Sequence, residues 1–119
     1  MFRRSIVALD TPMGADGDLD LAALDRLIEF HVGEGTDGIV IAGTTGESPT
    51  LEADELETLV RRAVEVADGR IPVIGGSGTN STAKTVALTR RVARAGAAAA
   101  LVVTPYYIKP VQAGLLAHY

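Results

Sequence analysis

The stretch Gly38-Ile39-Val40-Ile41-Ala42, followed directly by Gly43-Thr44-Thr45-Gly46-Glu47-Ser48, decides the fold class of this chain. A short apolar run without polar alternation is typical of a strand buried on both faces, as in a parallel sheet covered by helices. The glycines and hydroxyls that follow are typical of a loop at the carboxyl end of such a strand, where α/β proteins gather their functional groups. We therefore expect an α/β protein with a site after this strand.

Similar apolar runs occur at Ser5–Leu9, Ile71–Ile74 and Ala99–Val103, so that successive runs start 33, 33 and 28 residues apart. This spacing is close to the roughly 30 residues of a strand with its return helix. The segments between the runs, at about 21–32, 52–67 and 81–95, have apolar residues at helical spacing, and a fourth helix is expected to begin near Val111. The sequence thus predicts about four strand–helix units.

Small and polar residues follow every predicted strand, at Asp10–Pro12, Gly43–Ser48, Gly75–Asn80 and Thr104–Tyr107. A barrel draws its site from the carboxyl ends of many strands, whereas a doubly wound sheet concentrates it at one switch point. The even distribution favours a (β/α)8 TIM barrel, which needs roughly 250 residues. We expect residues 1–119 to form only the N-terminal half of that barrel domain, with no internal boundary.

Composition excludes several classes of protein. The chain has 119 residues, no cysteine and a net charge of -4, with 11 Lys and Arg against 15 Asp and Glu. Disulfides and thiolate metal sites are therefore excluded, and nucleic acid is an unfavoured partner. No apolar run reaches the ~20 residues of a membrane span. The start, with its basic pair Arg3-Arg4, lacks the apolar region of an export signal, so a cytoplasmic protein without a metal site or cofactor is expected.

Three loops are candidate sites. The amides and hydroxyls of Thr44 and Thr45 are suited to holding a carboxylate or moving a proton, although Gly and Thr are also common in a plain turn. Tyr106 and Tyr107 are adjacent, so at most one faces a pocket, and rim packing is the alternative to a proton relay. The glycine-rich Gly75–Asn80 lacks the Gly-Lys-Ser/Thr of a P-loop, and close packing of loop and helix is the favoured interpretation.

On these motifs the chain resembles the dihydrodipicolinate synthase family of the class I aldolase superfamily. The resemblance begins with Gly43–Ser48 and Thr50-Leu51, and continues through Ile71–Ile74, Gly78–Asn80 and Val103–Tyr107 with Pro110; Ser5–Leu9 and Thr11–Met13 fit as well. It covers essentially the whole chain. It implies a lyase of lysine and diaminopimelate biosynthesis, in which pyruvate forms a Schiff base with a barrel lysine and its enamine attacks aspartate 4-semialdehyde.

The resemblance also implies roles for single residues. Thr44 matches the family's relay threonine, and Thr45 matches the residue that binds the pyruvate carboxylate. Tyr107 matches the relay tyrosine that reaches across a tight dimer into the neighbouring site. Ser48, Asn80 and Tyr106 match positions at a dimer or effector interface. The full-length protein is accordingly expected to be a homo-oligomer, a tight dimer or a tetramer built from two such dimers.

Two departures limit what this chain does alone. The family's Schiff-base lysine, proton-donating tyrosine and substrate-binding arginine lie beyond residue 119, and neither Lys84 nor Lys109 is placed to replace that lysine. The segment is therefore expected to be inactive. In lysine-inhibited members, His stands at the positions of Ala53 and Leu56 and Glu at that of Lys84, so weak or absent inhibition by lysine is expected.

Three alternatives remain. One is another pyruvate-dependent aldolase of the superfamily, such as an N-acetylneuraminate lyase, although those enzymes usually carry Ser where this chain has Thr44. A second is a non-catalytic half-barrel that works only by assembly. A phosphoacceptor signalling domain has a suitable length, but it needs an acidic residue after the third strand, where this chain has Gly75-Gly76-Ser77.

Overall fold

The computed structural model describes residues 5–119 and contains a four-stranded parallel sheet in the order β1-β2-β3-β4. The strands are β1 (Ile6–Ala8), β2 (Gly38–Ile41), β3 (Val73–Gly76) and β4 (Ala99–Leu101). The helices are α1 (Leu21–Gly33), α2 (Ala53–Ala67), α3 (Thr82–Arg94) and α4 (Gln112–His118), with a short 3-10 helix η1 (Ser48–Thr50) before α2. Arg3-Arg4 lies outside the described residues.

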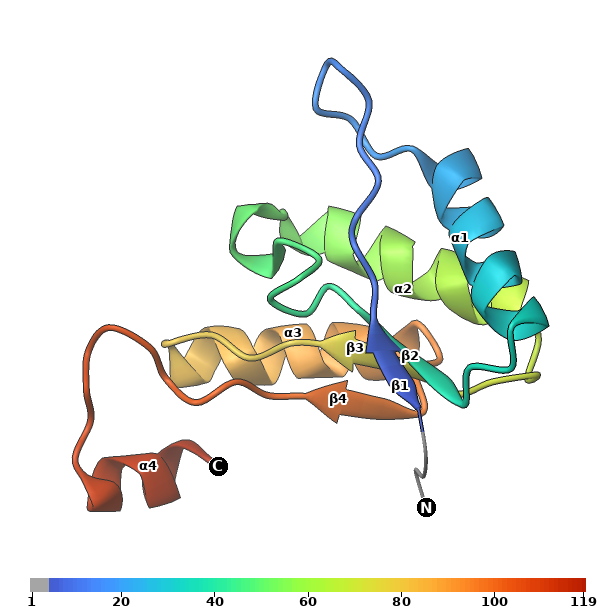
Figure 1. The fold of residues 1–119 in the computed structure, drawn as a ribbon. Helices are drawn as coiled ribbons and strands as arrows, with labels where there is room; N and C mark the ends of the chain where they lie inside the picture. The colour runs from blue at the N-terminus through green and yellow to red at the C-terminus, as the bar shows by residue number, and fades with distance from the viewer. Residues whose placement is uncertain (1–4) are drawn as a thin grey trace.

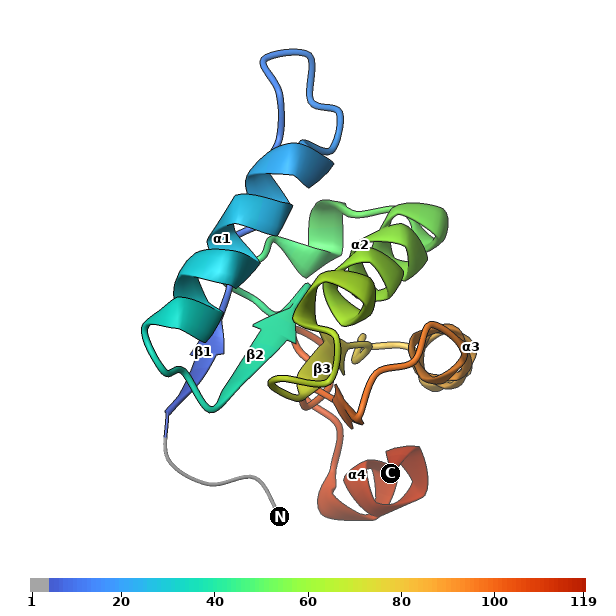
Figure 2. The ribbon, with the colours of Figure 1, turned by 90° about the vertical axis from the view of Figure 1, so that its right-hand side faces the viewer.

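Each strand pairs in parallel with the next strand along the chain. A doubly wound sheet would reverse its strand order at a switch point, whereas consecutive order is that of a barrel. Helices α1, α2 and α3 lie along one face of the sheet, and α4 lies apart from them beyond β4 (Figures 1 and 2). The predicted fold class, half of a (β/α)8 barrel with four strand–helix units, is confirmed.

The third strand differs from the prediction. It was expected at Ile71–Ile74, but β3 runs from Val73 to Gly76 and so takes in two glycines that were assigned to the loop. Both glycines are needed for close packing. A Cβ on Gly75 would overlap Val92 of α3, and one on Gly76 would overlap the carbonyl oxygen of Ala42. Here the two glycines let β3 pack closely against α3 and against the end of β2, and they do not end the strand.

The core lies between the sheet and the three helices. Leu24 and Ile28 of α1, Leu59 and Val60 of α2 and Val92 of α3 pack with Ile39 and are almost completely buried. Leu24 and Ile28 are four residues apart, and the buried residues of α2 (Leu56, Leu59, Val60, Ala63 and Ala67) recur at spacings of three and four, which places them on one face of the helix. Their burial holds α1, α2 and α3 against β2 and β3, so the ends of these strands have a rigid support.

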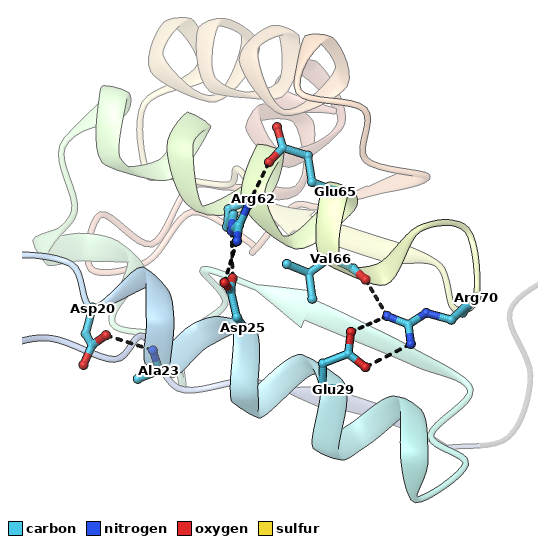
Figure 3. A network of polar contacts seen from close by, with 8 residues as sticks. All are labelled: Asp20, Ala23, Asp25, Glu29, Arg62, Glu65, Val66 and Arg70. Atoms are coloured by element: carbon cyan, nitrogen blue, oxygen red, sulfur yellow. Dashed lines mark hydrogen bonds and ion pairs between the residues drawn. The ribbon is translucent and has the colours of Figure 1, made fainter.

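Ion pairs join neighbouring helices across the outside of this core (Figure 3). Arg62 of α2 donates two hydrogen bonds to Asp25 of α1, at 2.8 Å from Nε and 2.5 Å from an Nη. Arg70 makes a similar two-pronged contact with Glu29, at 2.9 and 2.6 Å. These hydrogen bonds lower the pKa of the Asp25 and Glu29 carboxyls below their ordinary values.

Arg91 of α3 pairs differently, since one of its Nη atoms contacts the carboxylates of both Asp54 and Glu57 on α2. The sequence predicts that the arginine pairs Arg61-Arg62 and Arg90-Arg91 lie on solvated helix faces. Arg62 and Arg91 keep 40% and 33% of their side-chain surface exposed, and packing of consecutive helices in addition brings carboxylate partners within their reach. Among residues 5–119 no helix is both long and apolar enough to cross a membrane.

Candidate active site

The carboxyl end of β2 turns sharply at Ala42. This residue is buried and has a φ of 53°, in the left-handed region that a residue with a Cβ seldom adopts. Its carbonyl packs against Gly76 of β3, where a side chain would overlap it. The turn directs Gly43–Ser48 across the end of the sheet. Backbone strain of this kind persists where the surrounding packing imposes it, and it is common at functional sites.

The loop Gly43–Ser48 is held by hydrogen bonds within itself and by one from the loop after β1. Within the loop, Glu47 N–H donates to the Thr44 carbonyl at 3.1 Å and Ser48 N–H to the Gly43 carbonyl at 3.2 Å. From the loop after β1, the Thr11 hydroxyl donates to the Gly46 carbonyl at 2.7 Å. These bonds leave the side chains of Thr44 and Thr45 exposed on a fixed backbone.

Beside this loop is a pocket of about 300 Å³. Thr44 and Ser48 line it from the β2 side, and Tyr106 lines it from the loop after β4. The remaining lining residues come from η1, the residues between η1 and α2, α2, the end of β3 and the loop after it, α3 and the loop after β4: Pro49, Leu51, Glu52, Ala53, Leu56, Gly76, Ser77, Gly78, Thr79, Leu88 and Val103. The loops after β2, β3 and β4 thus converge, as expected for a barrel site.

The structure separates the six candidate residues into two groups. Thr44, Ser48 and Tyr106 line the pocket, whereas Thr45, Asn80 and Tyr107 do not. The expectation that at most one of the two tyrosines faces a pocket is confirmed, because Tyr107 is 92% exposed. Tyr107 has a φ of 71°, which turns its side chain away from its neighbour's. Thr44 and Tyr107 are therefore not brought together within this chain.

The loop after β3 is built from hydroxyl contacts. Ser77 is buried and its hydroxyl lies 2.7 Å from that of Thr89 on α3. The Thr79 N–H donates to the Thr85 hydroxyl at 2.9 Å, and the Ser77 N–H donates to the Leu101 carbonyl at 3.0 Å. Amides used in this way do not cradle a phosphate, which supports the packing interpretation of Gly75–Asn80. Gly78 adds to it, since a Cβ there would overlap the amide of Val103.

The nucleophile expected for this chemistry is not at the pocket. Lys84 is exposed on α3, and Lys109 is exposed in the loop after β4. The two histidines also lie elsewhere: His31 Nδ1 is 3.1 Å from the Thr36 hydroxyl, and His118 Nδ1 is 2.9 Å from that of Thr82. Within residues 5–119 no three potential metal-ligating side chains gather in one place.

Sequence reasoning missed two residues near this site. Thr11 was noted only as part of a motif, yet its hydroxyl holds the loop that carries Thr44. Glu52 precedes α2 and lines the pocket, and the Glu55 carboxylate accepts a 2.7 Å hydrogen bond from its backbone N–H. The capping pattern at the start of α2 was a signal for Glu52. For Thr11 the sequence contained none, because its acceptor lies 35 residues away.

A parallel sheet in consecutive order, with a pocket at the carboxyl ends of its strands, defines a barrel-type α/β protein. The chain belongs to the dihydrodipicolinate synthetase family, whose model matches residues 1–119. A protein of Thiobacillus denitrificans named 4-hydroxy-tetrahydrodipicolinate synthase is 60% identical over 117 residues, which are 98% of this chain and 40% of that protein. A protein of the same name from Shewanella sp. strain ANA-3 is 56% identical over the whole chain and 40% of its own length.

Solved structures agree with this assignment. The chloride-inhibited dihydrodipicolinate synthase of Acinetobacter baumannii, complexed with pyruvate, has a TM-score of 0.98 at 47% identity, over 100% of this chain and 41% of that one. The dihydrodipicolinate synthase of Aquifex aeolicus has a TM-score of 0.92 at 54% identity, over 96% and 39%. The chain therefore spans about two-fifths of the length of the relatives it matches.

Proposed function

We propose that residues 1–119 are the N-terminal half of the barrel domain of a 4-hydroxy-tetrahydrodipicolinate synthase. The complete enzyme would condense pyruvate, bound as a Schiff base, with aspartate 4-semialdehyde in the cytoplasm. The names of the relatives from Thiobacillus and Shewanella support the activity, and the pyruvate complex of the Acinetobacter relative supports the first substrate. The proposed assembly of the complete enzyme is a homo-oligomer built from tight dimers.

One observation carries the proposal for the site. The loop Gly43–Ser48 is locked by Thr11 at the end of β2, and it presents the exposed side chains of Thr44 and Thr45 at the mouth of the sheet. We assign carboxylate binding to Thr45, whose hydroxyl and backbone amide are both donors. We assign proton relay to Thr44, since a hydroxyl both donates and accepts and this one lies at the pocket.

The third assignment is Tyr107 as a relay group of a neighbouring site. Its exposure and its left-handed backbone support this role, because an aromatic side chain held in solvent by an unfavourable backbone conformation gains little from its own chain. Ser48, Asn80 and Tyr106 are proposed as contacts of a dimer or effector interface. Their position supports this only in part, since Asn80 does not line the pocket that Ser48 and Tyr106 share.

The chain by itself supplies a substrate clamp and part of a relay, without the nucleophile. Schiff-base formation needs a lysine amine that attacks the pyruvate carbonyl, and the two lysines of the chain lie outside the pocket. We therefore propose that catalysis requires the part of the protein that follows residue 119 in the family pattern.

A chimera tests the proposal. Residues 1–119 are fused to the part of the Thiobacillus synthase that they do not cover, and the product is assayed with pyruvate and aspartate 4-semialdehyde. We expect synthase activity, a raised KM for pyruvate in Thr45→Val and a lowered kcat in Thr44→Val, with the Thr→Ser variants as matched controls. A folded chimera that lacks this activity but cleaves N-acetylneuraminate would overturn the assignment in favour of the lyase.

A further inference from the structure

A hydrogen bond between two side chains joins α4 to the start of α3, although α4 lies apart from the helices that cover the sheet (Figure 1). The Nδ1 atom of His118 on α4 is 2.9 Å from the hydroxyl of Thr82, the first residue of α3. The other ring nitrogen, Nε2, is buried and has no partner among residues 5–119. Within these residues the contact with Thr82 therefore sets the orientation of the imidazole.

The segment between β4 and α4, Val102–Val111, carries both candidate tyrosines, and we call it the tyrosine loop. Tyr107 and Lys109 have φ values of 71° and 44°, in the left-handed region. Residues with a Cβ keep such conformations where the surrounding structure imposes them. Within the loop one backbone hydrogen bond is made, from Ile108 N–H to the Tyr106 carbonyl at 2.9 Å, and its middle is exposed. Its own contacts therefore do not account for its shape.

The two ends of the tyrosine loop are both held by the segment that follows β3. At the first end Gly78 packs closely on Val103, since a Cβ on the glycine would overlap the Val103 amide. The second end leads directly into α4, which the bond between His118 and Thr82 ties to α3. None of the residues of α4 is fully buried within residues 5–119, so apolar packing there does not duplicate this bond.

The placement of α4 is also that of a complete barrel. The Acinetobacter synthase matches 100% of this chain, α4 included, with a TM-score of 0.98, although this chain covers only 41% of that protein. The arrangement of α3 and α4 is therefore compatible with the residues that follow in a full-length relative, and the contact between the two helices can be tested in a complete protein.

We propose that His118 is a positioning residue for the tyrosine loop and acts through Thr82. The bond holds α4 against the start of α3 and so keeps the loop in the strained form that presents Tyr107 to solvent. This inference rests on the proposed function, in which Tyr107 completes the relay of a neighbouring site. A loop that moves delivers the phenol to that site less often. The carboxylate clamp at Thr45 is held separately, by the bond from Thr11.

Loss of the bond should lower kcat of the chimera and leave its KM for pyruvate unchanged. Thr82→Val and His118→Phe each remove the bond but keep the shape of the side chain, and each should lower kcat about fivefold, the factor that corresponds to one ordinary hydrogen bond. The double variant should be no slower than either single variant, because both remove the same contact. Thr82→Ser keeps the hydroxyl, and the amide of His118→Asn takes the place of Nδ1, so both should retain the kcat of the parent chimera.

Hydrogen exchange measures the tyrosine loop without reference to catalysis. In the folded chimera, peptides that cover residues 102–111 should exchange faster in Thr82→Val and His118→Phe, whereas peptides that cover Gly43–Ser48 should not change. The matched control is Thr36→Val, which breaks a pair of the same kind: the hydroxyl of Thr36, 3.1 Å from Nδ1 of His31, lies at the opposite end of the sheet. The chimera contains the residues that follow 119, so any support they give α4 is present in every variant.

Three results would overturn the proposal. They are unchanged exchange of the tyrosine loop in both variants, additive effects in the double variant, and faster exchange with an unchanged kcat. A KM for pyruvate that rises with the fall in kcat would also contradict it, because the effect would then be a general loosening of the site. A chimera without synthase activity would count against the proposed function, and the exchange measurement would still decide whether His118 positions the loop.

Discussion

The hydroxyl of Thr11 donates a 2.7 Å hydrogen bond to the carbonyl oxygen of Gly46 and thereby ties the loop after β1 to the loop after β2. The approach is close, since a Cβ on Gly46 would lie 3.0 Å from the Leu9 carbonyl oxygen. The position of Thr44 and Thr45 is therefore set partly by the loop after β1, which contributes no side chain to the pocket.

Replacement of Thr11 by valine tests this tie. Thr11→Val keeps the shape of the side chain but removes the donor, and it should cost about 1 kcal/mol of unfolding free energy. The backbone amide resonances of Thr44 and Thr45 should shift, and in the chimera the KM for pyruvate should rise. Thr11→Ser retains the hydroxyl and should restore all three. Unchanged amide resonances in Thr11→Val would show that the loop Gly43–Ser48 holds its position without the hydrogen bond from Thr11.

A methyl group at Gly76 should disrupt the turn after β2. In Gly76→Ala the new Cβ overlaps the carbonyl of Ala42, so we expect a loss of about 1–3 kcal/mol in unfolding free energy, measured by urea titration. The matched control is Gly33→Ala at the end of α1, where a Cβ meets nothing within 4 Å. Alanine should stabilise that position by up to about 1 kcal/mol. Equal effects of the two variants would contradict the packing described for β3.

The pair between Asp25 and Arg62 should make stability depend on pH. The hydrogen bonds from Arg62 lower the pKa of Asp25 in the folded state, so the pair stabilises the fold above the unfolded pKa of about 3.9. This contribution is lost as the pH falls through the lower folded pKa. Asp25→Asn should therefore be modestly less stable than the parent chain at pH 7, and the difference should vanish in acid.

The control for that measurement is Glu34→Gln, an exposed carboxylate with no ion pair to any residue from 5 to 119. Its stability should follow that of the parent chain at each pH. A difference between Asp25→Asn and the parent that stays constant from pH 7 to pH 2 would mean that the charge of Asp25 contributes nothing.

Incubation of the chain with pyruvate and borohydride should leave Lys84 and Lys109 unmodified. Both side chains are exposed and lie away from the pocket, so neither amine is positioned or activated for Schiff-base formation. Intact-mass spectrometry and peptide mapping give the readout, with the chimera as positive control. An adduct at either lysine in residues 1–119 alone would contradict the proposal that the Schiff-base lysine follows residue 119.

Lysine should inhibit the chimera weakly or not at all. Ala53 and Leu56, which line the pocket, offer no polar group to an amino acid, and the Lys84 ammonium repels another ammonium. Initial rates measured over a range of lysine concentrations test this. The matched variant Lys84→Glu reverses the charge and should increase any inhibition. Strong inhibition of the chimera carrying the parent sequence would contradict the expectation.

The local sequence pattern was sufficient to predict the order of strands and helices. Apolar runs and helical spacing reflect the face that each segment buries, whichever neighbour it packs against. It was insufficient for β3, whose two glycines are typical of a loop. Glycine is required at these two strand positions because Val92 and Ala42 pack so closely that a Cβ would overlap them. The same limit applies to the candidate site: adjacency in sequence grouped Tyr106 with Tyr107, while the backbone at Tyr107 separates them.

The sequence by itself determined a parallel α/β chain of four units with its polar loops at one end, since strand and helix periods and turn residues act over short distances. It also determined which groups are chemically available in the candidate loops: Thr44, Thr45, Tyr106 and Tyr107. The tertiary structure alone decided which of them share a pocket, that Thr11 holds the loop, and that Arg62 and Arg91 are paired. These relationships join residues tens of positions apart, and packing of helices on the sheet, which no local pattern encodes, brings them together.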